Sequence, residues 1–115
     1  MHTPLDTLAT SEFEAHAAEA AQFLKLLANE HRLLVLCHLL SSGDTSVTAL
    51  VEAVGLSQSA LSQHLAKLRE DGLVSFRRES QTLFYRVSDA RAERVLVVLK
   101  DIFCPTLGLP KETLP

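Results

Sequence analysis

The chain has 115 residues, of which 47% are hydrophobic, and a formal net charge of -3 at pH 7. This length provides one domain with a modest core, and the low content of glycine and proline excludes a fibrous or disordered chain. The first residues lack the basic and apolar parts of a signal peptide, and no apolar run approaches the ~20 residues that cross a bilayer, so we expect a cytoplasmic protein without a membrane partner.

Two amphipathic helices are predicted in the first part of the chain. The first covers residues 12–28 behind a Ser11 N-cap, and the second ends at the SSGD sequence of residues 41–44. Apolar residues recur at helical spacing in both. They are Phe13, Ala17, Ala20, Leu24 and Leu27 in the first helix, and Leu33, Leu36, Cys37 and Leu40 in the second.

Two further helices follow with a glycine turn between them. The third runs from about Ser46 to Val54 and ends at Gly55, and the fourth runs from a Ser57 N-cap to about Asp71. Gly72 provides a left-handed stop after the fourth helix. A short helix, a turn and a longer helix in this order are typical of a helix-turn-helix.

The last part of the chain predicts a hairpin and one more helix. LVSFRR (73–78) and TLFYRVS (82–88) are expected to be strands joined by ESQ, and Ser88 is expected to cap the final helix. We therefore divide the chain into a flexible segment 1–10, a domain 11–105 and a flexible tail 106–115. The predicted fold is mainly α with a two-stranded β-wing, a winged helix-turn-helix.

The outward face of the fourth helix suits the edges of DNA bases. When its three leucines point inward, small hydroxyl and amide side chains point outward near its N-terminal end, and glutamine can pair with adenine in the major groove. An ordinary solvated face is the alternative. The predicted DNA-binding residues of this helix are Gln58, Ser59, Ser62, Gln63 and Lys67.

Positive charge is concentrated in the second half of the chain, although the net charge of the whole chain is negative. Residues 1–30 carry five acids against Lys25 alone, whereas residues 60–86 carry five basic residues against three acids. In the hairpin, Arg77 and Arg78 are predicted to contact the phosphate backbone, and Arg86 either does so or pairs with an acid on the sheet. On charge alone, a solvated mixed-charge face is the favoured explanation of this distribution.

The first and last helices are too apolar for the core that one chain provides. The stripe of the last helix, formed by Val95, Val98, Leu99 and Ile102, is widened by Leu96, Val97 and Phe103. A homodimer through these two helices would bury them and set two fourth helices about one DNA turn, ~34 Å, apart.

These sequences together resemble one bacterial family. FLKLLANEHRLLVLCHLL (23–40), LVEAVGLSQSALSQHLAKLREDGLV (50–74) and RRESQTLFYRVS (77–88) are similar to the ArsR family of winged-helix repressors, over roughly residues 15–104. The resemblance implies a homodimer, operator binding by the fourth helix and the wing, and release by an inducer. It also places Gln58, Ser59, Ser62 and Gln63 on the family's base-reading positions.

The metal ligands of many ArsR relatives have no counterpart in this sequence. The thiolate pair of arsenic and cadmium sensors would fall near Ser46 and Thr48, and the last helix has no histidine for the zinc and nickel sites. We therefore expect no metal site and no cofactor. A metal held by Cys37, His38 and Cys104 remains an alternative, although His38 points about 100° away from Cys37 on a helix.

The cysteines allow several interpretations. In a cytosolic protein Cys37 and Cys104 are free thiols, metal ligands or a redox pair, and Cys37 on an apolar stripe is often just a small core residue. Their positions resemble those of the persulfide-sensing branch of the family, the BigR, SqrR and HlyU-like regulators. That resemblance implies that sulfur atoms link the two cysteines within a protomer. Cys104 at a helix end is then the better attacking thiol, and Cys37 the resolving one.

The sequence thus predicts a DNA-binding repressor, not an enzyme. Its partners would be double-stranded operator DNA, a second copy of the chain, and a persulfide or polysulfide inducer that releases the DNA. The alternatives are a metal sensor, an HlyU-like activator, and a winged-helix interaction module that does not bind DNA. A thiol enzyme is disfavoured because the sequence has no CxxC, no catalytic partner beside a cysteine and no cofactor loop.

Overall fold

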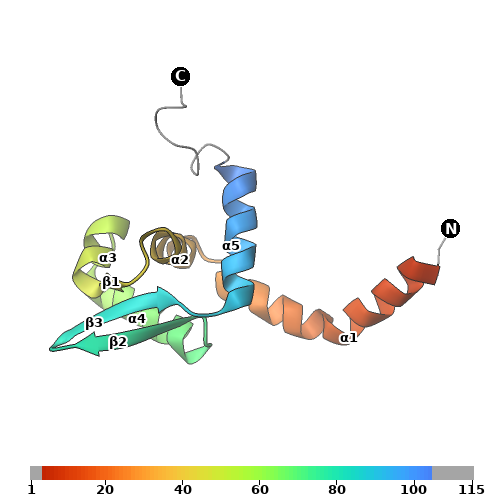
Figure 1. The fold of residues 1–115 in the computed structure, drawn as a ribbon, viewed down its shortest axis with the longest axis horizontal. Helices are drawn as coiled ribbons and strands as arrows, with labels where there is room; N and C mark the ends of the chain where they lie inside the picture. Colours follow the sequence, from red (N-terminus) through yellow and green to blue (C-terminus); the bar gives the residue numbers. More distant parts are fainter. Residues whose placement is uncertain (1–3, 105–115) are drawn as a thin grey trace, which may run out of the picture.

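A computed structural model describes the backbone of residues 4–104 and the side chains of residues 11–104 (Figure 1). The tail 106–115 lies outside the described residues, and so do residues 1–3 of the N-terminal segment. The element order is the one that the sequence predicts, with one short strand added. The elements are α1 (Pro4–Leu27), α2 (Glu30–Ser42), β1 (Thr45–Ser46), α3 (Val47–Val54), α4 (Gln58–Glu70), β2 (Val74–Glu79), β3 (Thr82–Val87) and α5 (Ala90–Phe103).

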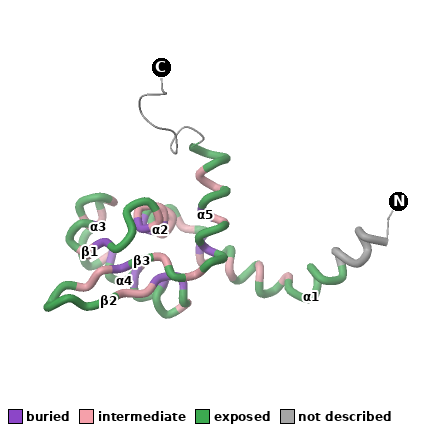
Figure 2. Tube along the Cα trace, viewed as in Figure 1, coloured by how far each residue is buried: buried purple, intermediate pink, exposed green. Residues whose placement is uncertain are grey.

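The core lies where α2, α3 and α4 meet the sheet and the first half of α5. Figure 2 shows buried residues gathered in this body, whereas α1 extends away from it and is largely exposed. The three leucines of α4 are almost completely buried, as its periodicity predicts. Because the core is aliphatic, burial of its leucines, roughly 2 kcal/mol for each side chain, is the main stabilising contribution. Its largest members are Leu36, Leu39, Leu50, Leu61, Leu65, Leu68, Leu73 and Leu96.

The sheet has three antiparallel strands in the order β1-β3-β2, so the prediction of two strands was incomplete. The hairpin pairs Val74 with Val87 and Glu79 with Thr82, close to the predicted limits. The added strand, β1, has two residues, and Thr45 pairs with Tyr85 of β3. This pairing fixes the base of the hairpin to the segment between α2 and α3.

Several helix ends agree with their sequence signals. The hydroxyl oxygens of Ser46 and Ser57 accept hydrogen bonds from the backbone N–H groups three residues later. After α4, Gly72 has a φ of 80°, and the N–H of Leu73 donates to the carbonyl of Leu68 at 2.9 Å. This is a Schellman arrangement, which needs the left-handed conformation that glycine adopts without strain.

Two predicted caps were wrong. Helix α1 begins at Pro4 instead of after Ser11, and proline is well suited to a first helical turn. Helix α5 is capped by Asp89 and not by Ser88. The Asp89 carboxylate accepts hydrogen bonds from the backbone N–H groups of Arg91 and Ala92 at 2.7 and 3.0 Å. Because a carboxylate also interacts favourably with the positive end of the helix dipole, it displaces the neighbouring hydroxyl.

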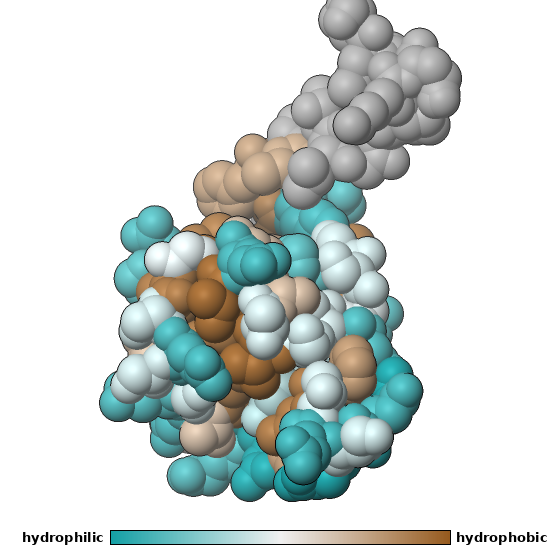
Figure 3. Space-filling view, turned by 90° about the vertical axis from the view of Figure 1, so that its left-hand side faces the viewer, coloured by the Kyte–Doolittle hydropathy of each residue, from teal (hydrophilic) through white to brown (hydrophobic). Residues whose placement is uncertain are grey.

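Large apolar side chains reach the surface mainly on α1 and α5. Phe13 and Leu24 on α1 and Val97, Val98, Ile102 and Phe103 on α5 are all exposed, with Phe103 75% exposed. On the side of α3 and the wing tip, Figure 3 shows a band of hydrophobic atoms bordered by hydrophilic side chains. Within the described residues, no helix has both the length and the apolar character needed to span a membrane.

Candidate nucleic-acid interface and thiol pair

Helix α4 presents a polar face to solvent, supported by α2 and α3. With Leu61, Leu65 and Leu68 buried, the outward side chains of its first turns are short and polar. No described side-chain hydrogen bond occupies their amides and hydroxyls, so these groups are available to base edges. The predicted DNA-binding residues of α4 are all exposed: Gln58, Ser59, Ser62, Gln63 and Lys67.

The two wing arginines are held differently, although they are neighbours in the sequence. The Arg77 guanidinium donates to Asp44 at 2.8 Å, forms a second ion pair with Glu79, and lies 4.7 Å from the ring centre of Phe84. These partners raise the pKa of Arg77 above its ordinary value, the hydrogen bond to Asp44 first. Arg78 is exposed and has no described ion pair. Arg78 is therefore the more available phosphate contact.

Asp44 is a residue that sequence reasoning missed. It lies directly before β1, and its carboxylate connects the end of α2 to the wing through Arg77. The two residues are 33 positions apart, so no local pattern could have indicated the pair.

Lys67, another predicted DNA-binding residue, also forms an ion pair. Its ammonium lies 3.4 Å from the Asp71 carboxylate, one helical turn later.

The two cysteines lie at the junction of α2 and α5. Cys37 is half-buried on α2 beside the aliphatic core, and Cys104 is exposed at the C-terminal end of α5. Burial raises the pKa of Cys37, the ammonium of Lys100 opposes that shift, and the nearby Cys104 adds to it. One cysteine lies on α2 and the other caps α5, and these two helices contact each other. Both are free thiols.

Lys100 marks the same junction from α5. Its Nζ donates to the Ser41 Oγ of α2 at 3.0 Å. Sequence reasoning missed this contact, which joins residues 59 positions apart. The one available signal was spacing, because Ser41 follows Cys37 by one helical turn and Lys100 precedes Cys104 by one turn.

The histidines do not form a metal centre in the part of the chain that the structure describes. No group of three or more His, Cys, Asp or Glu side chains gathers there at ligand distance. The rings of His31 and His64 have centres 6.0 Å apart. Burial lowers the pKa of His64, and Arg32 and His31 lower it further, which favours the neutral imidazole.

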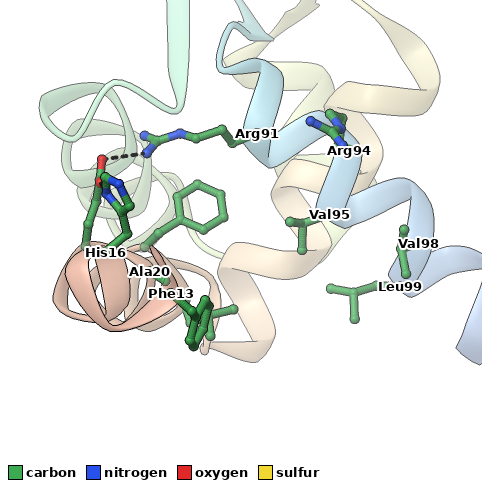
Figure 4. Close-up of a pocket in the computed structure, with 11 residues that line it drawn as sticks. Phe13, His16, Ala20, Arg91, Arg94, Val95, Val98 and Leu99 are labelled. Atoms are coloured by element: carbon green, nitrogen blue, oxygen red, sulfur yellow. Dashed lines mark ion pairs between the residues drawn. The ribbon is translucent and has the colours of Figure 1, made fainter. Parts of the chain in front are cut away.

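A groove of about 660 Å³ lies between α1 and α5 (Figure 4). Its walls are mainly apolar, with Phe13, Ala20 and Leu24 on α1 facing Val95 and Val98 on α5. At one end Arg91 forms an ion pair with Glu19 at 3.5 Å and lies over the Phe23 ring. The groove thus brings together the surfaces that the sequence predicts to be covered by a second copy of the chain.

The helix-turn-helix part of the chain matches a model of a known protein family. Residues 29–75 match the model described as "Bacterial regulatory protein, arsR family". The match covers α2, α3, α4 and the start of β2, which are the elements that position the outward face of α4.

Individual relatives are similar over most of the chain. The transcriptional activator HlyU of Vibrio cholerae is 47% identical over 93 residues, which are 81% of this chain and 85% of that protein. The solved structure of reduced HlyU from Vibrio cholerae aligns with a TM-score of 0.75 at 47% identity, covering 81% of this chain and 97% of that one. The transcriptional repressor BigR of Xylella fastidiosa aligns with a TM-score of 0.78 at 39% identity, covering 83% and 96%. These relatives are regulators of transcription and not enzymes.

Proposed function

Because the chain belongs to the arsR family of bacterial regulatory proteins, we propose that it is a dimeric transcriptional regulator whose operator binding ends when sulfur links Cys37 to Cys104. The observation that carries this proposal is the contact between α2, which carries Cys37, and α5, which is capped by Cys104. A sulfur bridge would therefore join the core-forming helix α2 to the apolar helix α5.

DNA recognition is assigned to α4 and the wing. In a dimer joined through α1 and α5, two α4 helices would enter successive major grooves about 34 Å apart. Gln58, Ser59, Ser62 and Gln63 would contact base edges, while Lys67 and Arg78 contact phosphates. Arg77 contributes by holding the wing against Asp44. The exposed apolar faces of α1 and α5 support a dimer, since a monomer would leave them in water.

The inducer chemistry follows from the different exposure of the thiols. The exposed Cys104 thiolate attacks the outer sulfur of a persulfide RSSH, forming Cys104–S–SH and releasing RS⁻, which takes up a proton. The Cys37 thiolate then attacks the Cys104 sulfur, which forms a disulfide and expels HS⁻. The two thiols lose two electrons in total, and the transferred sulfur is reduced to sulfide.

A longer bridge forms when both cysteines have become persulfides. The terminal sulfur of one persulfide attacks the cysteine sulfur of the other and expels HS⁻, which leaves a trisulfide. An additional sulfur atom spans a wider gap than a direct disulfide, whose Cα atoms must lie about 4.4–6.8 Å apart. Bridge length is therefore a means of distinguishing sulfur donors from peroxide.

The link would act by favouring one relative position of α2 and α5. Closing a loop of this length with a disulfide is worth about 4 kcal/mol against the unfolded chain. The link shifts the equilibrium between the DNA-binding and the released conformation only if it stabilises one of them more than the other. A change in their ratio from 1:99 to 99:1 requires a difference of about 5.5 kcal/mol. With one link in each subunit of a dimer, each link would have to contribute about 2.8 kcal/mol of this difference.

The test measures DNA affinity and protein mass together. The reduced protein first selects a binding sequence from random DNA, and affinity is then measured before and after polysulfide, peroxide or a small disulfide. We expect at least about a tenfold loss of affinity with a Cys37–Cys104 link in the intact mass. Cys37→Ser and Cys104→Ser should each bind DNA when reduced and no longer respond. Undiminished binding by the linked protein would overturn the proposal.

The sign of the transcriptional effect has two candidates. Similarity to the repressor BigR favours repression, and similarity to the activator HlyU favours activation. A repressor and an activator can share the same DNA-binding switch, so a reporter gene behind the selected operator separates them. Transcription that rises on addition of polysulfide indicates repression, and transcription that falls indicates activation.

A further inference from the structure

An ammonium group stands between the two helices that carry the cysteines. Lys100 Nζ donates to Ser41 Oγ at 3.0 Å, which brings the charge from α5 onto the surface of α2. The Cys104 backbone N–H donates to the Lys100 carbonyl at 2.8 Å, so Lys100 and Cys104 lie one above the other on the same helix. Ser41 and Cys37 have the same spacing on α2. Lys100 is therefore one helical turn from Cys104, and its hydrogen-bond partner Ser41 is one turn from Cys37.

The surroundings of Lys100 strengthen the electrostatic influence of its charge on the thiols. Cys37 loses hydration among leucines, which raises the pKa of its thiol, and Lys100 acts in the opposite direction on the same group. Lys100 itself is half-buried, which reduces screening of its charge by solvent. Its only described hydrogen-bond partner is a neutral hydroxyl, so no described carboxylate cancels the charge.

We propose that Lys100 is a specificity-determining residue of the thiol pair, whose ammonium group favours reaction with an anionic sulfane-sulfur donor, such as polysulfide, over a neutral oxidant. This rests on the proposed function, since it assigns the inducer class of the same site. Ser41 is a positioning residue that holds the ammonium beside both cysteines. A polysulfide anion is drawn toward the cation, whereas hydrogen peroxide is not.

The ammonium group of Lys100 would act on the charge that develops when a cysteine thiolate attacks polysulfide. The cysteine thiolate forms a bond to one sulfur of HS–Sx⁻, the sulfur–sulfur bond of the donor breaks, and a shorter sulfide dianion leaves and is protonated by water. Negative charge therefore accumulates on the donor as the bond breaks. An adjacent ammonium stabilises this charge more than it stabilises the separated reactants, which accelerates the step.

Two alkylating agents that differ in charge measure the effect without any sulfur chemistry. Iodoacetate is an anion and iodoacetamide is neutral, while both transfer a two-carbon group to a thiolate. In the full-length reduced protein, we expect Lys100→Gln to lower the iodoacetate-to-iodoacetamide rate ratio at both cysteines by about fivefold. Peptide mass spectrometry assigns each rate to Cys37 or Cys104. Lys100→Arg should restore the ratio.

Matched variants separate this charge effect from general changes. Ser41→Ala keeps the ammonium but removes its anchor, so we expect a smaller drop in the ratio. Lys25→Gln removes one positive charge from α1, which carries neither thiol, and should leave the ratio unchanged. Raising the salt concentration should reduce the ratio in the parent protein and have little effect in Lys100→Gln.

The same variants connect the charge to the inducer. The rate of thiol loss with tetrasulfide should fall about fivefold in Lys100→Gln relative to the rate with hydrogen peroxide. Equal loss with both reagents, or an unchanged alkylation ratio, would overturn the role of Lys100. If instead the ratios change as expected and the linked protein still binds DNA, the proposed function fails while the assignment of Lys100 stands.

Discussion

Two regions of the molecule use apolar stripes in opposite ways. In the region proposed to contact DNA, which is formed by α3, α4, β2 and β3 and is called the DNA-facing region below, the stripe of α4 is buried against the chain's own core. In the arm region, formed by α1 and α5, side chains of the same kind remain exposed, among them Phe13 at 65% and Ile102 at 61%. Periodicity thus identifies a face that must be covered, but it does not say whether the same chain or another one covers it.

The proposed function divides the molecule along the same line. A region that completes its own core holds its exposed side chains in fixed positions, as reading a base sequence requires. A region that relies on a partner can change its packing when one contact changes. Cys37 lies on α2 in the body and Cys104 at the C-terminal end of α5, so a covalent link between them would act on the less constrained region.

The largest effect is expected from a charge placed in the arm region. Val98→Asp puts a carboxylate on an apolar side chain that is 53% exposed and lines the groove between α1 and α5. Burying that charge in a dimer is costly, so we expect dissociation and about a 100-fold or greater loss of DNA affinity. Sedimentation measures the mass, and anisotropy measures binding.

The control places the same carboxylate in the DNA-facing region. Ser62→Asp lies on the outward face of α4, where it should abolish DNA binding by repelling phosphates and leave the dimer intact. A Val98→Asp protein that remains a dimer would show that α5 does not form the interface.

The next largest effect concerns base recognition by α4. Gln63→Ala removes an amide that can make two hydrogen bonds to adenine, and we expect about a tenfold loss of affinity for the selected sequence. Affinity for random DNA should hardly change, because phosphate contacts dominate it. Competition between specific and random DNA gives the ratio. Equal losses on both would place Gln63 outside base recognition.

Much of the DNA-facing region could be predicted because its signals are local. The buried leucines of α4, the Ser57 cap and the Gly72 stop follow from spacing and from the properties of single residues. Strand β1 could not be predicted, since two residues show no alternation and pair only through the backbone of β3.

The missed features of the site have the same origin. The contacts Asp44–Arg77 and Ser41–Lys100 join residues far apart in the chain, and each partner alone looks like an ordinary surface residue. Periodicity placed the base-reading candidates on the exposed face of α4, but it could not tell which wing arginine has its donors occupied.

A smaller effect is expected from the two wing arginines, whose guanidinium groups differ in whether carboxylates already bind them. Arg78→Ala should reduce the slope of log affinity against log salt by about one, as expected for the loss of one phosphate contact. Arg77→Ala should change the slope less, because its guanidinium is paired with Asp44 and Glu79. Asp44→Ala removes one of the two carboxylates that hold Arg77 and should increase the slope. An equal decrease in both arginine variants would mean that Arg77 leaves its partners to bind DNA.

The smallest effect is expected at Asp89, where the wing ends and α5 begins. Burial raises the pKa of Asp89, but hydrogen bonds from the Arg91 side chain and from the backbone N–H groups of Ala92 and Arg91 bring it below its ordinary value. A carboxyl whose pKa is lower in the folded state stabilises the protein above its unfolded pKa. That contribution is lost as the pH falls through the folded pKa.

Replacement of Asp89 by asparagine isolates the charge, because asparagine still caps a helix. Near neutral pH, Asp89→Asn should lower the free energy of unfolding by about 0.5 kcal/mol after solvent screening. Below the folded pKa the parent carboxyl is neutral too, so urea unfolding should give equal stabilities there. Asp89→Ala should cost about 1 kcal/mol near neutral pH, because it removes the cap itself. A difference between parent and Asp89→Asn that persists in strong acid would mean that packing, and not charge, distinguishes the two side chains, and α5 would then be held to the body by the shape of its first turn.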